Sequence, residues 1–182
     1  VAIGYKALYS DTTAGANSAL GYAALYQNTT GPRNAALGYQ ALYTNTTSAD
    51  NTAMGYQAMY TNAGAQNTAF GSFALALNTT GTPNTALGAY TLYANTTGVG
   101  NVAVGGGPGG SGIDAALQAN TTGSYNTAVG VAALKSNTTA SANTAVGGYA
   151  LWTSNGGAND TAIGYQSLFS NTTGSSNVAV GG

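Results

Sequence analysis

Residues 38–55 read GYQALYTNTTSADNTAMG, and close copies of this stretch fill nearly the whole chain of 182 residues. In each copy a glycine follows an alanine and a bulky apolar residue, and successive glycines lie 17, 17, 17, 16, 17, 17, 25, 17, 17 and 17 residues apart. A short unit repeated in this way predicts a solenoid, in which each coil buries its apolar side chains only against its neighbours. The repeating glycines are Gly4, Gly21, Gly38, Gly55, Gly71, Gly88, Gly105, Gly130, Gly147, Gly164 and Gly181.

The residues just before each glycine have the pattern of a short β-strand. The stretch 126–130, Asn-Thr-Ala-Val-Gly, contains β-branched residues and is bounded by Asn and Gly. Alternation along a strand places Thr127 and Val129 on one face and Ala128 on the other. The alanine is the same in every copy, whereas the apolar residue after it varies. We therefore expect the alanine inside a thin coil and the variable residue at a looser apolar contact, such as one between chains.

A second apolar pair, Ala-Leu, lies after each glycine, as in Ala133-Leu134, and is usually followed by an aromatic residue. Leu or Met fills its second place in every complete copy, which predicts a core position. The pattern Tyr-x-x-Leu-Tyr also fits one helical turn. Packed helices need about 8–10 Å between axes, whereas paired strands lie about 4.8 Å apart. We predict an all-β protein, a parallel β-roll-like solenoid of about ten 17-residue coils; the alternative is a strand-plus-helical-turn solenoid.

Residues 1–182 are expected to form a single solenoid domain. Val1 begins in mid-repeat and Gly182 follows a motif glycine, so we expect the chain to be a fragment of a longer protein. The coil that starts at Gly105 is eight residues longer than the others, and the stretch 105–112, GGGPGGSG, is predicted to be a loop insertion. The coil that starts at Gly55 is one residue shorter, with the loss at 63–66.

An asparagine stands four residues before the glycine in nine coils, and Asp160 takes its place in one. A side-chain amide repeated at one point of each coil can bond to the coils on either side and to the local turn. We predict a structural ladder along the solenoid. Its members are Asn17, Asn34, Asn51, Asn67, Asn84, Asn101, Asn126, Asn143 and Asn177.

The Asn-Thr-Thr stretch of each coil has the composition of a turn. It also matches the Asn-x-Ser/Thr pattern of N-glycosylation acceptors. Because the repeat copies one turn many times, these matches are not independent. The predicted acceptors are Asn28, Asn45, Asn78, Asn95, Asn120, Asn137 and Asn171, together with Asn159.

Composition excludes several classes of function. The chain has three Lys or Arg, four Asp, a net charge of −1, and neither His nor Cys. Phosphate binding needs clustered basic residues, so we expect no nucleic-acid partner. The carboxylates, Asp11, Asp50, Asp114 and Asp160, are interpreted as turn variants two or more coils apart, which predicts no enzyme, cofactor or metal site. No apolar run has transmembrane length, so no membrane insertion is expected.

The stretch 123–130 resembles the Gly-x-x-Ser-x-Ala-x-Gly unit of trimeric autotransporter adhesin heads, and Ala133 also matches. The coil here is longer than in that family, through the Leu-Tyr-x-Asn-Thr-Thr arm. The repeated NTAxGYQALYxNTTG string is also similar to arrays in tail-fibre-type surface proteins of bacteria and phages. The resemblance implies a left-handed parallel β-roll, usually trimeric, in an extracellular fibre.

We therefore expect a structural segment of an extracellular fibre or surface filament, at a cell or virion surface, that is adhesive and self-associating. Its expected partners are further copies of itself, as a trimer or filament, and a glycan or cell-surface receptor. A third hypothesis is that the chain is a fragment of a tailspike-like enzyme, for which we expect no depolymerisation of polysaccharides. The alternative is a ligand-binding surface, with a glycan on a tyrosine column (Tyr5, Tyr22, Tyr39, Tyr56) or ice on a threonine row (Thr52, Thr68, Thr85, Thr127, Thr144, Thr161) that Ala35, Val102 and Val178 interrupt.

Overall fold

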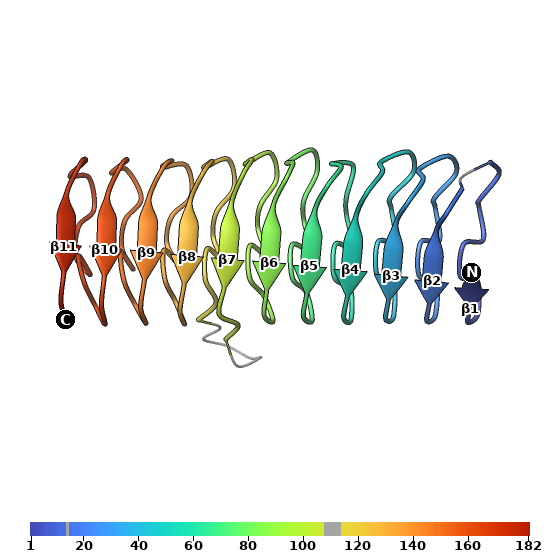
Figure 1. Cartoon of the computed structure of the whole chain (residues 1–182), viewed down its shortest axis with the longest axis horizontal. Helices are drawn as coiled ribbons and strands as arrows, with labels where there is room; N and C mark the ends of the chain where they lie inside the picture. Colours follow the sequence, from blue (N-terminus) through green and yellow to red (C-terminus); the bar gives the residue numbers. More distant parts are fainter. Residues whose placement is uncertain (14, 108–113) are drawn as a thin grey trace.

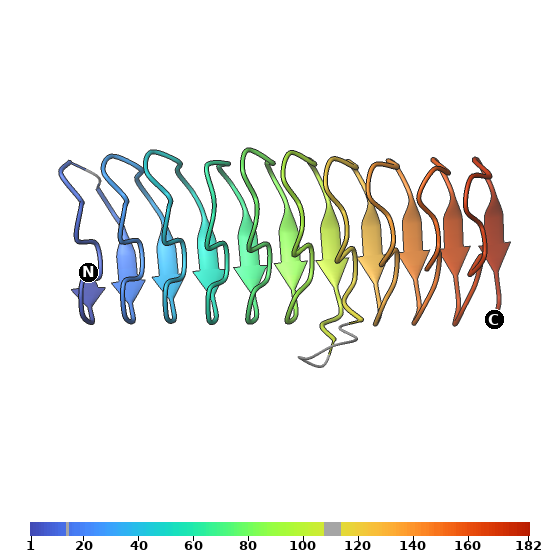
Figure 2. The same ribbon diagram turned by 180° about the vertical axis from the view of Figure 1, so that it is seen from behind.

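The computed structural model describes residues 1–13, 15–107 and 114–182. Eleven short strands form one parallel sheet in chain order, and the described residues contain no helix (Figure 1). The coils stack into a rod with the two termini at opposite ends (Figures 1 and 2). The predicted all-β parallel solenoid is thus confirmed. The strands are β1 (Ala2–Ile3), β2 (Ser18–Leu20), β3 (Ala35–Leu37), β4 (Thr52–Met54), β5 (Thr68–Phe70), β6 (Thr85–Leu87), β7 (Val102–Val104), β8 (Thr127–Val129), β9 (Thr144–Val146), β10 (Thr161–Ile163) and β11 (Val178–Val180).

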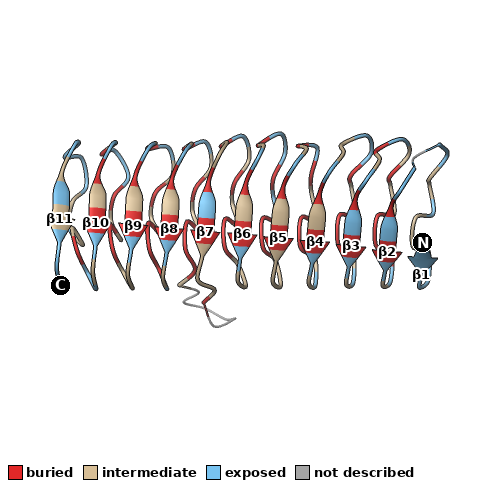
Figure 3. Cartoon of the chain, viewed as in Figure 1, coloured by how far each residue is buried: buried red, intermediate tan, exposed pale blue. Residues whose placement is uncertain are grey.

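Every strand pairs with the next in the same register, alanine beside alanine. In β8 and β9, for example, Ala128 is the partner of Ala145. From β2 to β10 the middle alanine is buried and the residues on either side of it are partly or fully exposed (Figure 3). The predicted alternation is confirmed, and the alanine must be small because the opposite wall of the coil lies close behind it.

The glycine after each strand has a backbone that other residues rarely adopt. Gly38 has a φ of 135°, and a Cβ added there would lie 2.4 Å from the carbonyl oxygen of Gly55 in the next coil. Both the left-handed conformation and the close approach of the next coil therefore require glycine.

The arm between the glycine and the Asn-Thr-Thr turn is not helical, so the helical-turn alternative is wrong. Gln40 and Leu42 have φ values of 53° and 52°, which interrupt a right-handed helix. Their N–H groups bond outside the coil, from Gln40 to the Tyr22 carbonyl at 2.8 Å and from Leu42 to the Ala58 carbonyl at 3.1 Å. Coils that are joined by backbone hydrogen bonds lie closer together than the axes of packed helices, so each coil cannot contain a helix.

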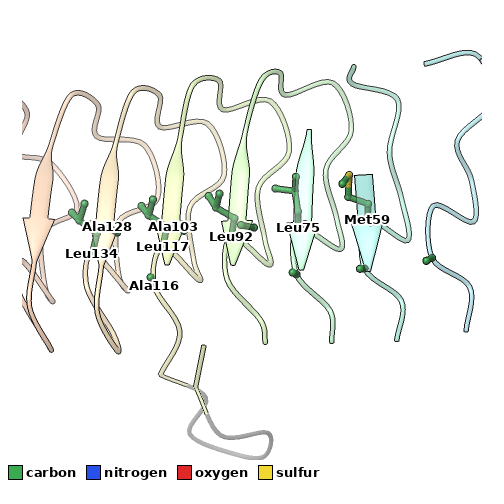
Figure 4. Packing of buried hydrophobic residues seen from close by; sticks show 14 of the residues in the cluster. Met59, Leu75, Leu92, Ala103, Ala116, Leu117, Ala128 and Leu134 are labelled. Carbon is green, nitrogen blue, oxygen red and sulfur yellow. The ribbon is translucent and has the colours of Figure 1, made fainter. Parts of the chain in front are cut away.

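A column of leucines and one methionine fills the interior opposite the strand alanines (Figure 4). Leu75, Leu92 and Leu117 have no exposed surface, so the predicted core position is confirmed. Burying a leucine contributes about 1.5–3 kcal/mol, whereas its left-handed backbone costs about 1–2 kcal/mol. Burial therefore offsets the strained conformation in each coil.

Two coils depart from the 17-residue length without changing the register of the sheet. The short coil still pairs Thr52 with Thr68, and the long one pairs Val102 with Thr127. The missing residue in the short coil leaves the buried Nδ2 of Asn51 without a hydrogen-bond partner. Most of the insertion predicted at 105–112 lies outside the described residues, because the description stops at 107 and resumes at 114.

Candidate functional site

The asparagines before the strands form a hydrogen-bond ladder along the interior, which we call the pre-strand ladder. The side-chain oxygen of each member accepts the backbone N–H of the next member, over 2.8–3.0 Å. Apart from Asn51 and Asn177, the Nδ2 groups donate to a turn carbonyl of the next coil, as Asn84 does to Gly98 at 2.9 Å. These side chains bond to backbone groups in adjacent coils, and their role in the structure is to tie the coils together.

The asparagines of the Asn-Thr-Thr turns form a second ladder, here called the turn ladder. Each Nδ2 donates to the Oδ1 of the previous member, as from Asn95 to Asn78 at 2.8 Å, and to its own turn carbonyl. Asn62, which no glycosylation motif marks, belongs to this ladder and bonds to Asn45 at 3.4 Å. Sequence reasoning missed this ladder, although the regular spacing of these asparagines was a signal for it. Its members are Asn28, Asn45, Asn62, Asn78, Asn95, Asn120 and Asn137.

Burial of the turn ladder bears directly on the predicted glycosylation residues. Six of them are fully buried, and the Nδ2 atom that would carry a glycan is already a hydrogen-bond donor. A glycan at those six cannot be accommodated in the folded solenoid, since its sugar would have to replace the core. The six are Asn28, Asn45, Asn78, Asn95, Asn120 and Asn137. Asn159 is exposed and Asn171 is half-buried, and glycosylation at these two stays a prediction.

The strand face of the rod carries a continuous row of apolar side chains, which we call the apolar row. Its members stand at the last position of each strand, directly before the glycine. In the interior coils Leu20 is 46% exposed and Leu87 is 37% exposed. Parallel register aligns these side chains along the whole rod, and exposed apolar patches of such extent are typical of interaction surfaces. The row consists of Ile3, Leu20, Leu37, Met54, Phe70, Leu87, Val104, Val129, Val146, Ile163 and Val180.

The predicted threonine row lies on the same strand face, beside the apolar row. Thr85 and Thr127, for example, are half-buried at the first position of their strands. Over β1 to β4 the apolar row borders an open groove of about 360 Å³, whose other side is formed by the residues at the start of the strands, such as Ser18, Ala35 and Thr52. This groove is lined almost wholly by apolar and small side chains, so it suits an apolar partner.

Tyrosines form two columns on the arms, the first exposed and the second half-buried except at Tyr9. Tyr5, Tyr22, Tyr39 and Tyr56 stack with ring centroids 5.0–5.2 Å apart. A second column, Tyr9, Tyr26, Tyr43 and Tyr60, stacks at 5.1–5.3 Å. Each ring between two others in these stacks has its flat faces covered by its neighbours and presents only its edge. Sugars stack on ring faces, so the columns favour mutual stiffening over glycan stacking.

The charged residues form two ion pairs among the described residues. Arg33 donates to Asp50 in the next coil, from Nε to Oδ1 at 2.6 Å and from Nη2 to Oδ2 at 2.8 Å. The hydrogen bond from this exposed guanidinium lowers the pKa of Asp50.

The second pair is Lys135 with Asp114, at 2.6 Å, where the Tyr149 hydroxyl also donates to Asp114 at 3.1 Å. The hydrogen bond from Lys135 lowers the pKa of Asp114, and the bond to Asp114 raises the pKa of Tyr149. Asp114 stands three residues before Leu117, where other coils have the first tyrosine. It is therefore not one of the expected turn variants.

No group of three or more His, Cys, Asp or Glu lies together as a metal centre within 1–13, 15–107 and 114–182. In the same residues no helix is long and apolar enough to cross a bilayer. The fold brings together two sets of predicted site residues in the interior: the asparagines of the pre-strand ladder, and the six predicted glycosylation residues that belong to the turn ladder. The features that face outward are the apolar row, the threonine row and the tyrosine columns.

Comparison with known proteins gives no assignment, because no family model, no curated protein and no solved structure matches the chain.

Proposed function

We propose that this chain is a structural segment of an extracellular fibre or surface filament, which associates with copies of itself through the strand face and has no catalytic role. The observation that carries the proposal is the apolar row, which runs from β1 to β11 without a charged residue. Water contact along such a row is unfavourable by about 25 cal/mol for each Å² of apolar surface, so covering it with the same row of another copy is favourable.

The repeating coils support the same proposal, because each coil presents an equivalent strand face to a partner copy. The assembly we propose is a trimer or filament at a cell or virion surface, with an adhesive outer face that contacts a glycan or a surface receptor.

Self-association is tested by charge substitution on two faces. We expect the wild-type chain to sediment as an oligomer and to appear as rods in electron micrographs. The double variant Leu37→Lys with Leu87→Lys should be monomeric, because lysines in the apolar row would be buried at the interface. The matched control, Thr47→Lys with Thr97→Lys, alters two exposed turn residues and should assemble like the wild type. A monomeric wild type at high concentration would contradict the proposal.

Adhesion is tested separately, by retention of the assembled rods on a glycan array and on intact cells. Specific retention that the control variant keeps would support an adhesive role. If the rods assemble but bind neither the glycan array nor the cells, the adhesive role is contradicted and the structural role alone remains.

The strand face also supports a second candidate function, binding to ice. The observation that favours it is the regular alignment of threonine and apolar rows on one sheet face. Ala35, Val102 and Val178 interrupt the threonines. A thermal-hysteresis assay distinguishes the two functions. Thermal hysteresis in the wild type that Thr85→Asp abolishes would favour ice binding. If the monomeric protein shows no thermal hysteresis, ice binding is excluded.

A further inference from the structure

One coil differs from all the others in its interior. Between Gly147 and Gly164 the turn ladder has Ser154 where an asparagine is expected, and the pre-strand ladder has Asp160. A regular coil places two side-chain NH₂ groups at this corner, as Asn137 and Asn143 do in the coil before it. The coil with Ser154 and Asp160 therefore supplies no side-chain NH₂ group from its two ladder positions.

The neighbouring coils show the effect of these replacements. Asn171 makes no bond to the shorter Ser154 side chain. Its Nδ2 instead donates to Oδ2 of Asp160 at 2.8 Å and to the Gly174 carbonyl at 2.9 Å. Asp160 Oδ1 accepts the backbone N–H and the Nδ2 of Asn177, at 2.8 and 3.0 Å. Asp160 thus accepts the donor that Ser154 leaves without a partner.

Two buried oxygen atoms remain without any partner in this corner. Oδ1 of Asn137, which would accept from the next member of the turn ladder, has none, and neither has Oγ of Ser154. Both residues are fully buried, as is Asp160. A buried polar atom without a partner is costly, so two such atoms on successive members of one ladder point to a ligand between them.

The other groups at this corner are also oxygen atoms. In a regular coil the missing NH₂ would bond to the carbonyl three residues later, which here belongs to Gly157 and accepts only Asn143, at 3.0 Å. Asp160 packs closely on the same residue, since a Cβ added to Gly157 would lie 2.7 Å from Asp160 Oδ2. The corner therefore combines a carboxylate, an amide oxygen, a hydroxyl and a carbonyl.

The charge of this corner decides what kind of ligand fits. The ion pairs within the described residues join Arg33 to Asp50 and Lys135 to Asp114, and neither includes Asp160. The hydrogen bonds that Asp160 accepts from Asn171 and Asn177 come from neutral donors, and a fully buried negative charge is unfavourable without a positive charge nearby. Oxygen ligands of these types suit hard cations, and a single carboxylate is balanced by one positive charge.

We infer that this coil binds a monovalent cation, sodium or potassium, between the turn ladder and the pre-strand ladder. Its ligands are Oδ1 of Asn137, Oγ of Ser154 and the carboxylate of Asp160, with the Gly157 carbonyl as a fourth oxygen. The ion takes the place of the missing NH₂ group and ties two successive coils together, the one that contains Asn137 and the one that contains Ser154, Gly157 and Asp160. This inference is independent of the proposed function, because it concerns the interior of the rod.

The first test is thermal unfolding of the whole chain in NaCl, KCl or choline chloride at equal ionic strength. We expect a rise in Tm that saturates with the concentration of one alkali cation and is absent with choline. The double variant Ser154→Asn with Asp160→Asn restores the regular pair and should fold without ion dependence. Asp50→Asn removes an exposed carboxylate and should keep the ion dependence of the wild type.

A second test does not depend on stability. Crystals grown with rubidium or thallium should show an anomalous peak within ligand distance of Ser154 Oγ, and Ser154→Ala should weaken it. The inference would be overturned if the Tm were the same in all three salts and the crystals showed only a water molecule, and no ion, at this position.

Discussion

At the scale of single residues, this protein depends on small and amide side chains more than on large apolar ones. Alanine and glycine let the two walls of a coil approach each other, and asparagine satisfies backbone groups that the strands do not reach. A buried hydrogen bond has a modest net value of about 0.5–1.5 kcal/mol, but an unpaired buried group costs about 1–3 kcal/mol. Because the unit is repeated, a residue that stabilises one coil stabilises every coil, and a residue that destabilises one coil destabilises every coil.

The glycine after the strand gives the first prediction. Gly38→Ala should destabilise the rod by at least about 2 kcal/mol, since the left-handed conformation alone costs about 1–2 kcal/mol and the added Cβ meets the Gly55 carbonyl. Gly15→Ala has open space and should lie within about 0.5 kcal/mol of the wild type. Urea unfolding followed by circular dichroism measures both, and equal midpoints for the two variants would contradict this account.

The turn ladder gives the second prediction. Asn95 bonds to Asn78, Asn120 and the Gly98 carbonyl, all in the buried interior. Asn95→Ala leaves the Asn78 oxygen and an Asn120 N–H unpaired, so a loss of about 2–4 kcal/mol in unfolding free energy is expected. Thr97→Ala, at an exposed position of the same turn, is the control. If both variants melt like the wild type, the turn ladder does not stabilise the rod.

At the scale of elements, strands of two or three residues are stable only because each is paired within an eleven-stranded sheet. The arms are joined from coil to coil by backbone bonds although they are not strands, as from Gln27 to the Tyr43 carbonyl at 3.0 Å. The long coil has the same backbone bonds, as from Leu117 to the Ala133 carbonyl at 3.0 Å. It has an additional contact through Asp114, which bonds to Lys135 in the next coil and Tyr149 in the one after. This contact anchors the chain where it returns from the insertion.

The anchor gives a prediction about pH. The folded-state pKa of Asp114 lies below its ordinary value of 3.8, so the stability that it contributes is present above that value and lost as the pH falls through the lowered pKa. Asp114→Asn should therefore lower the Tm at neutral pH, and the difference from the wild type should disappear in acid. Tyr149→Phe should lower the Tm less, because it removes one neutral donor. A difference for Asp114→Asn that is the same at every pH would exclude the charge as its cause.

At the scale of the whole molecule, the rod is a one-dimensional stack in which each coil contacts mainly its two neighbours. One continuous hydrophobic core runs through it, from Ala19 to Ala162. The unfolding free energy is then close to a sum of contributions from the individual coils and from the interfaces between neighbouring coils. A coil can therefore be removed without changing the structure of the remaining coils.

Deletion of a complete coil tests this additivity. Removing residues 39–55 joins equivalent positions, so the shortened chain should fold with a lower unfolding free energy and a rod shorter by about 4.8 Å. Removing residues 39–46 takes away about half a coil and should disrupt the stack, because the next strand then has no register partner. Small-angle scattering and circular dichroism distinguish the outcomes. Two deletions that behave alike would contradict a coil-by-coil architecture.

The repeat by itself determined the parallel stacking of coils, the inward alanine and leucine and the outward apolar row, because equivalent residues of a stack must share one environment. It did not determine the arm, where left-handed residues such as Leu42 replaced the helical turn that the spacing also allowed. Nor did it show that Asn95 lies inside, because a polar turn has the same composition whether its asparagine points in or out. Only the closed coil decided that direction, and only the stack brought Asp114 to Lys135 and Asn171 to Asp160. Such contacts depend on how a coil closes upon itself, which a local pattern of residues does not encode.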